Sequence, residues 1–306
     1  MRKPTGTFKR NTGRRITSAV IYFILICISF VYLEPVFRVI SKTFMSAADV
    51  IDPAVDWLPK ASSLDNLKIA ARVLNLKTSL LNSLWFSSLL AAAQTLVSAL
   101  TGYALSRYEF RFKRFWFMMI LLAFVVPLPV LMVPRLMMFI SFQEAAGIKM
   151  IGTALPQVAM ALLGQGVYST VLILIFYNFF NMIPRVLDEA AMIDGASPIQ
   201  VFYHVVVRLS LTTVLVVFLF SFVWNWNETY VTGTLVAGTI ELLPGKLNLF
   251  DQQFENLISA SGSAFRLNEA YKMAATFISI LPLILLYLLV QKQFIQGIEN
   301  TGITGE

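Results

Sequence analysis

Asp188-Glu-Ala-Ala-Met-Ile-Asp-Gly-Ala-Ser197 is a polar, helix-capable stretch within an apolar sequence. It separates two long uncharged runs, residues 150–184 and 209–227. A helix needs about 20 apolar residues to cross a bilayer, so runs of this length are typical of membrane spans. The stretch is therefore predicted to join two spans. A simple connection between two spans would not need such a regular, helix-capable motif.

The composition of the whole chain also favours a membrane protein. Of the 306 residues, 57% are hydrophobic and 13% are charged, whereas soluble domains carry about 25% charged residues. The chain therefore has too little charge to cover a soluble surface. We expect an all-α integral membrane protein with about six transmembrane helices.

Uncharged runs divide the chain into a first span and a larger membrane core. We expect a basic arm (1–15), a first transmembrane helix (16–43), an external loop (44–77) with a short helix at 64–74, a core (78–296) that includes the polar loop (184–207) and a second external region (228–272), and a tail (297–306). Within the core, the expected helices are 78–106, 115–134, 151–163, 167–182, 209–227 and 273–290.

Prolines mark a special point in the third expected span. Pro127, Pro129 and Pro134 fall late in the run 115–134, and Arg135 follows them. Proline removes a backbone donor and clashes with the preceding turn. We therefore expect this helix to be kinked or broken there, with Arg135 just past the break.

Basic residues predict the orientation of the spans. The first 15 residues carry six basic residues and no acid, in a chain of net charge +7, and the short loop 107–114 carries four basic residues and one acid. Short basic segments stay on the cytoplasmic side, so we expect both termini and the polar loop to be cytoplasmic. The alternative is that the basic N-terminus is an arm that binds nucleic acid or a specific lipid. Because we favour the cytoplasmic flank of a membrane span, we expect no nucleic-acid partner.

Local signals predict the shape of the polar loop. Pro184 suits the first turn of a helix over 185–193 because that position needs no donor. Gly195 can adopt the left-handed conformation that ends a helix. Ser197 and Pro198 then suit the N-cap and first turn of a second helix. The loop is predicted to be helix, sharp turn, helix.

Acidic residues lie early in the first of these helices. The helix dipole favours Asp188 and Glu189 there, and both could also pair with basic residues of a partner. We interpret the loop as a docking element for a separate motor protein, with an ordinary connecting loop as the alternative.

The sequence lacks the motifs of several other functional classes, namely ATP binding, ion coupling and metal binding. The sequence contains no G-x-x-x-x-G-K-[ST] phosphate loop. The uncharged runs of the expected spans, 16–33 in the first one, contain no Asp or Glu, the groups that ion-coupled carriers place in the membrane. The single cysteine cannot form an intrachain disulfide, and the single histidine excludes a multi-histidine metal site. We therefore expect a non-catalytic subunit whose energy comes from another protein.

Several motifs resemble those of one transporter family. Glu189-Ala-Ala, Asp194-Gly-Ala-Ser197 and Phe202 together resemble the EAA loop of bacterial ABC importer permeases. Four further segments resemble the carbohydrate-uptake, MalG-like branch in the family's order: Leu81-Asn-Ser83, Gly102-Tyr-Ala-Leu-Ser-Arg107, Trp224-Asn-Trp-Asn-Glu228 and Gln291-Lys-Gln-Phe-Ile-Gln-Gly297.

The resemblance implies a role and a set of partners. It implies a permease subunit in a bacterial cell membrane that forms half of a sugar pathway. A second homologous permease, two ABC ATPase subunits that bind ATP and Mg, and an external solute-binding protein would be its partners, and the chain itself would hold no cofactor. The coupling residues that it implies are Asp188, Glu189, Ala190, Ala191, Asp194, Gly195 and Ser197.

One position departs from the family pattern. The family usually has a proline late in the loop, in a Leu-Pro-Leu-like run, and this chain has Arg208 there. We therefore expect the loop to enter the fifth span without the usual kink, with an added charge at the membrane boundary.

Polar and aromatic residues in or beside the spans are candidates for the substrate pathway. Such residues serve either as hydrogen bonds between helices or to recognise sugar hydroxyls, and the tryptophans either stack on a sugar or form an interfacial belt. Arg135 either pairs with another subunit or meets an acidic substrate. The candidates are Asn82, Gln94, Arg135, Tyr177, Asn178, Asn181, Trp224, Asn225, Trp226, Asn227 and Glu228.

Two other functions stay open at this point. An ABC permease for another solute would share the same motifs. An ion-coupled secondary transporter or a membrane scaffold would need no ATPase partner.

Overall fold

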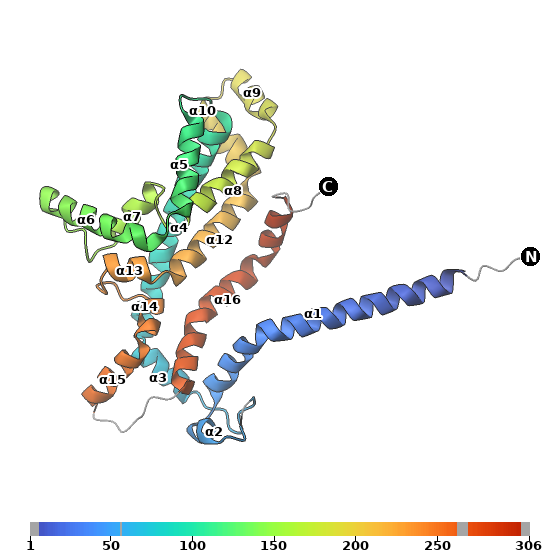
Figure 1. Ribbon diagram of the computed structural model, residues 1–306, viewed down its shortest axis with the longest axis vertical. Helices are drawn as coiled ribbons and strands as arrows, with labels where there is room; N and C mark the ends of the chain where they lie inside the picture. Colours follow the sequence, from blue (N-terminus) through green and yellow to red (C-terminus); the bar gives the residue numbers. More distant parts are fainter. Residues whose placement is uncertain (1–5, 56, 262–268, 301–306) are drawn as a thin grey trace, which may run out of the picture. The chain divides into compact units, whose positions relative to one another are not determined.

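The computed structural model describes residues 6–55, 57–261 and 269–300 (Figure 1). These residues form helices, together with one isolated antiparallel bridge between Met45 and Ser62. In chain order the helices are α1 (Gly6–Phe44), α2 (Ala47–Ile51), α3 (Asp65–Val73), α4 (Leu76–Arg107), α5 (Lys113–Val125), α6 (Leu128–Ala146), α7 (Leu155–Leu162), α8 (Ser169–Met182), α9 (Arg185–Ile193), α10 (Pro198–Gln200), the π-helical segment η1 (Val201–Val206), α11 (Val207–Leu209), α12 (Leu211–Asn227), α13 (Tyr230–Leu235), α14 (Leu243–Asn248), α15 (Phe250–Ser261) and α16 (Glu269–Asn300).

The helices confirm an all-α membrane protein that crosses the bilayer several times. Within the described ranges, four helices are long and apolar enough to span a membrane, and two bent pairs bring the number up to six. The four are Thr17–Phe44, Leu76–Arg107, Leu128–Ala146 and Glu269–Gln293. About six spans were expected from the sequence.

The third expected span differs from the prediction. The break is confirmed, but it lies at Val126 and Pro127, so α5 ends at Val125 and α6 runs on to Ala146. Pro127 precedes α6, a position that needs no donor. Pro134 lies inside α6 and does not end it, as is tolerated in membrane helices. Arg135 therefore lies past the break, as expected, but within α6 and eight residues after Pro127.

Other boundaries shifted by smaller amounts. Helix α1 begins at Gly6, so most of the expected basic arm belongs to the same helix as the first span, and residues 1–5 lie outside the described residues. Helix α16 runs to Asn300, beyond the expected end at 290. The rest of the expected tail, 301–306, and residues 262–268 of the second external region are also outside the described residues.

The chain forms two compact units, which are described separately. The first comprises Met1–Val73 and Phe254–Ile278, and the second comprises Leu74–Gln253 and Ser279–Glu306. The first unit contains α1, whose candidate span Thr17–Phe44 is not buried by the described chain.

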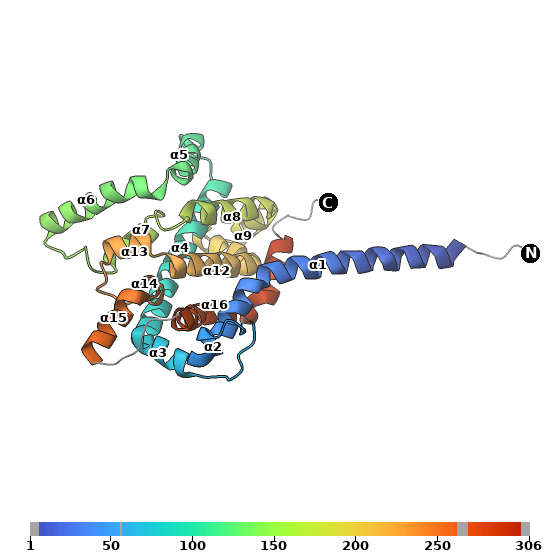
Figure 2. The ribbon, with the colours of Figure 1, turned by 60° about the horizontal axis from the view of Figure 1, so that its bottom comes forward.

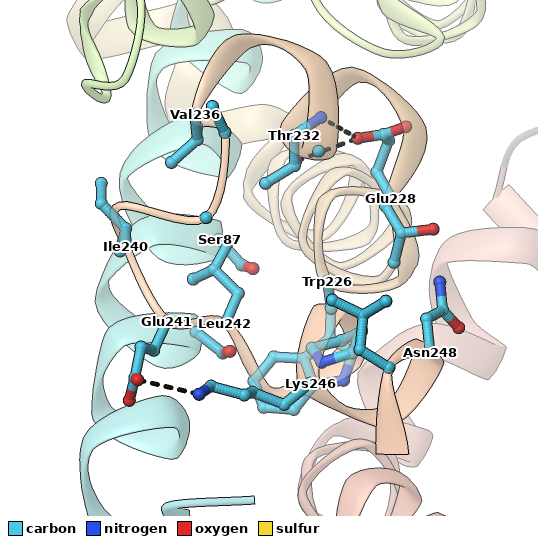
Figure 3. Close-up of a pocket in the computed structure, with 18 of the residues that line it drawn as sticks. Ser87, Trp226, Glu228, Thr232, Val236, Ile240, Glu241, Leu242, Lys246 and Asn248 are labelled. Atoms are coloured by element: carbon cyan, nitrogen blue, oxygen red, sulfur yellow. Dashed lines mark hydrogen bonds and ion pairs between the residues drawn. The ribbon is translucent and has the colours of Figure 1, made fainter. Parts of the chain in front are cut away.

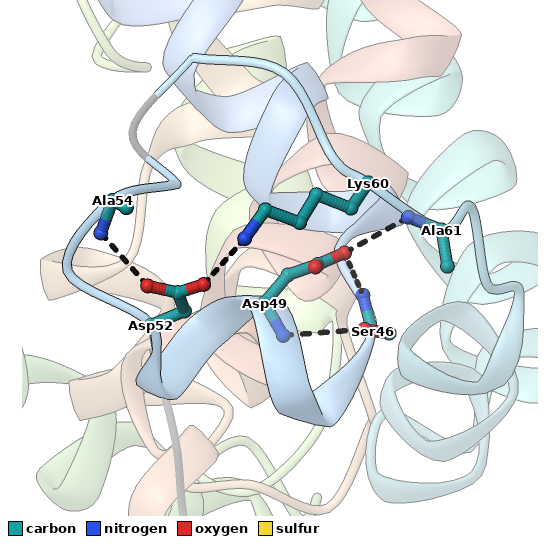
Figure 4. A network of polar contacts seen from close by, with 6 residues as sticks. All are labelled: Ser46, Asp49, Asp52, Ala54, Lys60 and Ala61. Atoms are coloured by element: carbon teal, nitrogen blue, oxygen red, sulfur yellow. Dashed lines mark hydrogen bonds and ion pairs between the residues drawn. The ribbon is translucent and has the colours of Figure 1, made fainter.

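The expected external loop in the first unit is partly helical and tightly hydrogen-bonded. Figure 4 shows Ser46 and Asp49 in a capping box at the start of α2, and Asp49 Oδ2 also accepts a 3.2 Å bond from the Ala61 amide. Lys60 Nζ lies 2.6 Å from Asp52 Oδ2, and this hydrogen bond lowers the pKa of Asp52. The short helix expected at 64–74 is confirmed as α3.

Helix α4 is the centre of the second unit. It packs against α8, α12 and α7 (Figure 2). The backbones of α4 and α8 approach closely at Gly102, where an added Cβ would lie 2.7 Å from Phe176 Cβ and 2.9 Å from the Tyr177 amide nitrogen. Small residues permit this kind of close helix contact in membranes. Buried Phe176 and Phe180 fill the adjoining core.

Candidate functional site

The polar loop has the predicted local structure. Helix α9 occupies residues 185–193, as expected, and Gly195 has φ of +88°. Ser197 caps the second helix by a capping box with Gln200, in which the Ser197 amide donates to Gln200 Oε1 at 2.7 Å. The turn therefore depends on a left-handed glycine followed by a side-chain cap.

Apolar side chains of the loop are exposed beside its acidic ones. Ile193 and Ile199 are 86% and 80% exposed, and Val186 is also largely exposed. Glu189 and Asp194 are exposed as well. An exposed apolar patch of this kind is typical of a surface that binds another protein.

Asp188 does not belong to this exposed surface. Its Oδ2 lies 2.7 Å from Arg107 Nε at the end of α4, and the two side chains are only 8% and 6% exposed. The expectation that Asp188 pairs with a partner protein was therefore wrong, because α9 turns this carboxylate inward. Arg107 was not among the predicted site residues, because its partner lies 81 positions later in the chain.

Further hydrogen bonds attach the loop to α4. Arg107 Nη2 donates to the Ile183 carbonyl at 2.9 Å, and Arg185 Nη2 donates to the Ser106 carbonyl at 3.2 Å. Arginine at a helix C-terminus also interacts favourably with the helix dipole. The first helix of the loop is thus fixed to the last turn of α4.

The second helix of the loop contacts α4 through aromatic rings. The ring of Tyr103 lies 4.9 Å from that of Phe202 and 6.0 Å from that of Phe180. Val201 and Val206 are buried beneath the same segment. Both helices of the loop therefore rest on one end of α4.

The chain bends sharply where the loop enters the fifth span. The segment Pro198–Leu209 and α12 meet at 82°, although the family's proline is absent. The expectation of an entry without a kink was wrong. Buried Ser210 Oγ donates to the Val206 carbonyl at 2.7 Å and to the Val207 carbonyl at 3.2 Å. Serine bonds of this type bend helices, and the π-helical segment adds a local irregularity.

Two of the pathway candidates form a buried hydrogen-bond network. Gln94 Nε2 donates to the Val167 carbonyl at 3.1 Å and to Ser169 Oγ at 3.2 Å, while Gln94 Oε1 accepts from Ser221 Oγ and from Asn225 Nδ2. The network joins α4, α8 and α12. It fits the alternative in which polar residues hold spans together.

Trp226 and Glu228, together with Asn225 of this network, line a cavity of about 510 Å³ towards the opposite end of α4, and Asn82 lies outside its lining (Figure 3). Trp226 is 2% exposed there, which argues against an interfacial belt position for this ring. The Glu228 carboxylate caps α13 by accepting bonds from the Val231 and Thr232 amides at 2.7 and 2.9 Å. Asn82 Nδ2 donates to the Glu241 carbonyl at 3.1 Å.

The rim of this cavity carries a charged pair. Lys246 Nζ lies 2.8 Å from Glu241 Oε1, and Asn75 Nδ2 donates to Glu241 Oε2 at 2.6 Å. The Lys246 hydrogen bond is the main cause that lowers the pKa of Glu241. An apolar cavity with a few polar groups is typical of a small-molecule site.

The structure does not bring the remaining candidates to this cavity. The Trp224 ring lies 4.9 Å from the ring of Tyr168, and Tyr177 packs on Phe117. Asn227 donates to the Val223 carbonyl within its own helix. Two further candidates on α8, Asn178 and Asn181, are exposed, and Arg135 lines a separate cavity.

The described residues contain no group of three or more His, Cys, Asp or Glu side chains that could hold a metal ion. The features described above that could bind a partner or a ligand are the polar loop held on α4 and two cavities.

The sequence pattern of one family, described as binding-protein-dependent transport system inner membrane component, matches residues 94–300. The chain is 25% identical over 278 residues to the probable starch degradation products transport system permease protein AmyC of Thermoanaerobacterium thermosulfurigenes, with 90% of this chain and 93% of that protein covered. It is 29% identical over 228 residues to the sn-glycerol-3-phosphate transport system permease protein UgpE of Pectobacterium atrosepticum, with 72% of each covered.

Two further comparisons extend over more of the chain. The arabinooligosaccharides transport system permease protein AraQ of Halalkalibacterium halodurans is 22% identical over 299 residues, with 95% of this chain and 100% of that protein covered. The fold is similar to a chain of a bacterial ABC transporter involved in the import of the acidic polysaccharide alginate, with a TM-score of 0.69, 21% identity, and 92% and 98% of the two chains covered.

Proposed function

Because this chain belongs to the family of binding-protein-dependent transport system inner membrane components, we propose that it is the sugar-conducting permease subunit of a bacterial ABC importer. The observation that carries the proposal is the attachment of the exposed loop to α4 by the buried Arg107–Asp188 pair. A loop held in this way can pass a displacement to the membrane helices. Its exposed surface stays available to a partner.

The substrate class follows from relatives. Their names give starch degradation products, arabinooligosaccharides and sn-glycerol-3-phosphate as transported compounds. These are sugars or a sugar-related polyol phosphate. We propose a sugar or oligosaccharide for this chain, with another solute of the same transporter class as the alternative.

The loop is proposed to dock on an ABC ATPase subunit. Ile193, Ile199 and Val186 would enter an apolar cleft of that subunit, and exposed Glu189 and Asp194 would meet its basic side chains. ATP and Mg would be bound by two such ATPase subunits, and this chain would hold no cofactor. The permease itself is not an enzyme.

Helix α4 is proposed to carry the motion. At its C-terminal end it is bonded to α9, and nearer its start Ser83 Oγ accepts a 2.7 Å bond from the Leu243 amide at the large cavity. Closure of the ATPases would move the loop and α4 as one body, which is a common form of transition between two packings. ATP must bind one packing more tightly than the other for this to occur.

A second homologous permease would complete the pathway, and an external solute-binding protein would deliver the substrate. In this arrangement the loop and both termini face the cytoplasm, as the positive-inside rule indicates. The large cavity then lies on the external side of the described second unit, where a substrate arrives.

Co-purification of the tagged chain from its native membrane in mild detergent tests the proposal. We expect an ABC ATPase and a second permease in a defined ratio, identified by mass spectrometry. A variant with Ile193→Ser and Ile199→Ser should lose the ATPase and keep the second permease. A chain that repeatedly purifies alone would instead support an ion-coupled carrier or a scaffold, and uptake that depends on an ion gradient would separate those two.

A further inference from the structure

A second cavity lies at two non-helical segments, one between α5 and α6 and one before α8. It has a volume of about 260 Å³ and is lined by the break between α5 and α6, by Arg135, and by the non-helical segment 164–168 before α8. Non-helical backbone at membrane depth occurs where it is buried in protein or lines a water-filled cavity. These two segments therefore bring polar backbone groups to a cavity in an apolar part of the chain.

Arg135 supplies a fixed positive charge to this cavity. It lies in the middle of the candidate span Leu128–Ala146. Its Nη2 donates to Gln165 Oε1 at 3.2 Å, and no ion pair joins it to an acid in the part of the chain that the structure describes. The cavity lining contains no Asp or Glu. A charge in a membrane span is costly and is normally paired or faces a functional cavity.

Two helix N-termini at the cavity contribute positive potential, although the C-terminus of α5 also lines it. Helix α8 begins there, and its N-cap residue Tyr168 has φ of +53°. The amides of Gly166, Val167 and Tyr168 donate no hydrogen bond to any acceptor in the described ranges. Helix α6 also begins at this cavity, after Pro127. Helix N-termini and runs of free amides attract anions.

Helix α4 holds the segment before α8 in place. Gln94 of α4 bonds to the Val167 carbonyl and to Ser169 Oγ on the same segment. Gly166 lies so close that an added Cβ would be 1.9 Å from Gln94 Nε2. The segment therefore has a fixed position relative to α4.

We infer that this cavity binds one anionic group, a carboxylate or a phosphate, of the transported sugar. The inference rests on the proposed function and deepens it. Arginine suits the task because its planar fork holds two oxygens at once. Drug-sized ligands occupy pockets of about 300 to 1,000 Å³, so 260 Å³ suits a single charged ring rather than a long chain.

Chemical modification of Arg135 tests the inference. The intact importer, with its partner subunits, is placed in phosphatidylcholine nanodiscs and treated with phenylglyoxal, which modifies accessible arginines. Mass spectrometry follows the peptide that contains Arg135. Glucuronate and glucose 6-phosphate are the anionic probes, and glucose is the neutral one. Arg114, an exposed residue, is the internal control.

Both anionic probes should slow the modification of Arg135, and glucose should not. At ten times its Kd a ligand leaves about one-eleventh of the sites free, so the rate should fall about tenfold. Arg114 should react at the same rate throughout. Equal rates at Arg135 with and without the anions would overturn the inference.

Two other results would also overturn it. If phosphatidylglycerol in the nanodisc protects Arg135 and the sugars do not, the anion is a lipid headgroup. If Arg135 is unreactive in the importer before any probe is added, an acidic side chain of a partner subunit occupies the cavity. Neither result depends on ATP-driven uptake, so failure of the proposed function is seen separately as an absence of uptake of any sugar.

A matched pair of variants separates charge from shape. Gln165→Glu would place a carboxylate beside Arg135, at the position where Gln165 Oε1 now lies 3.2 Å from Arg135 Nη2, and should abolish protection by both anions. Gln165→Met removes the hydrogen bond without adding charge and should retain the protection. Protection that survives in Gln165→Glu would contradict an electrostatic site.

Discussion

Arg107 Nε and Asp188 Oδ2 form an ion pair of 2.7 Å that is almost excluded from solvent. The pair joins the last turn of α4 to α9, the first helix of the polar loop (residues 184–207). Because Arg107 also donates to the Ile183 carbonyl at 2.9 Å, its guanidinium is held on two sides. The loop and α4 therefore respond together to any force that acts on either of them.

Asp188→Asn should weaken this attachment. The change leaves the buried Arg107 charge without its counter-ion, and removal of one partner of a buried pair typically costs about 3 to 5 kcal/mol. We expect a lower Tm of the purified importer and slower uptake, while ATP hydrolysis by the partner subunits continues. Uptake and hydrolysis are measured in the same proteoliposomes.

The double variant Arg107→Met, Asp188→Leu is the control for this prediction. It removes both charges and fills their space with apolar side chains of similar size. We therefore expect a Tm closer to that of the original chain. Its uptake should remain slow if directed bonds are needed for coupling. Unchanged uptake in Asp188→Asn would show that the pair has no part in transmission.

Gly195→Pro should abolish uptake without preventing membrane insertion. Gly195 has φ of +88°, whereas proline fixes φ near −65°. The turn between α9 and α10 would then open and misplace the docking surface. Uptake assays together with quantification of the chain in membranes check the outcome.

Gly147→Pro is a matched control for that change. Gly147 also has a positive φ, +66°, and likewise has open space around its α-carbon, but it ends α6 rather than the docking loop. It should retain most of the uptake. Equal losses in the two variants would indicate general damage instead of a specific coupling defect.

Local signals allowed the docking loop to be predicted residue by residue. Pro184, Gly195 and Ser197 act through neighbouring backbone groups, so the sequence was sufficient for α9 and the turn after it. The uncharged runs similarly predicted the spans. These features depend on residues a few positions apart.

Features that depend on distant residues were not predictable. The inward direction of Asp188 is set by Arg107, and the position of Arg135 inside α6 depends on which of three prolines interrupts the helix. Gln94 and Asn225 were candidates for the substrate pathway. Only the packing of α4 against α12 shows that they bond to each other.

Acid should loosen the rim of the large cavity at a pH below the ordinary range of a glutamate. The Lys246 hydrogen bond lowers the pKa of Glu241 from its usual 4.5. A lowered folded-state pKa means that the stabilisation is present above pH 4.5 and is lost as the pH falls through the lowered value. The hydrogen-exchange protection factors of segment 239–249, which correct for the pH dependence of free amides, should therefore stay constant from about pH 7 to pH 5 and fall below 4.5.

Lys246→Met provides the comparison for the acid response. It removes the main cause of the pKa shift, so the loosening should begin at a higher pH than in the original chain. Asn75 would still donate to Glu241 Oε2. The same transition in both chains would show that Glu241 does not control the rim.

Ser210→Ala should reduce uptake by a moderate factor. The hydroxyl of Ser210 donates to the Val206 and Val207 carbonyls at the 82° bend into α12. A neutral hydrogen bond contributes about 1 kcal/mol, which corresponds to roughly fivefold in an equilibrium. Ser210→Thr keeps the hydroxyl and should retain uptake. Distances between spin labels on α9 and α12 would report the bend directly, and a bend that is unchanged in Ser210→Ala would assign it to the π-helical segment η1 instead.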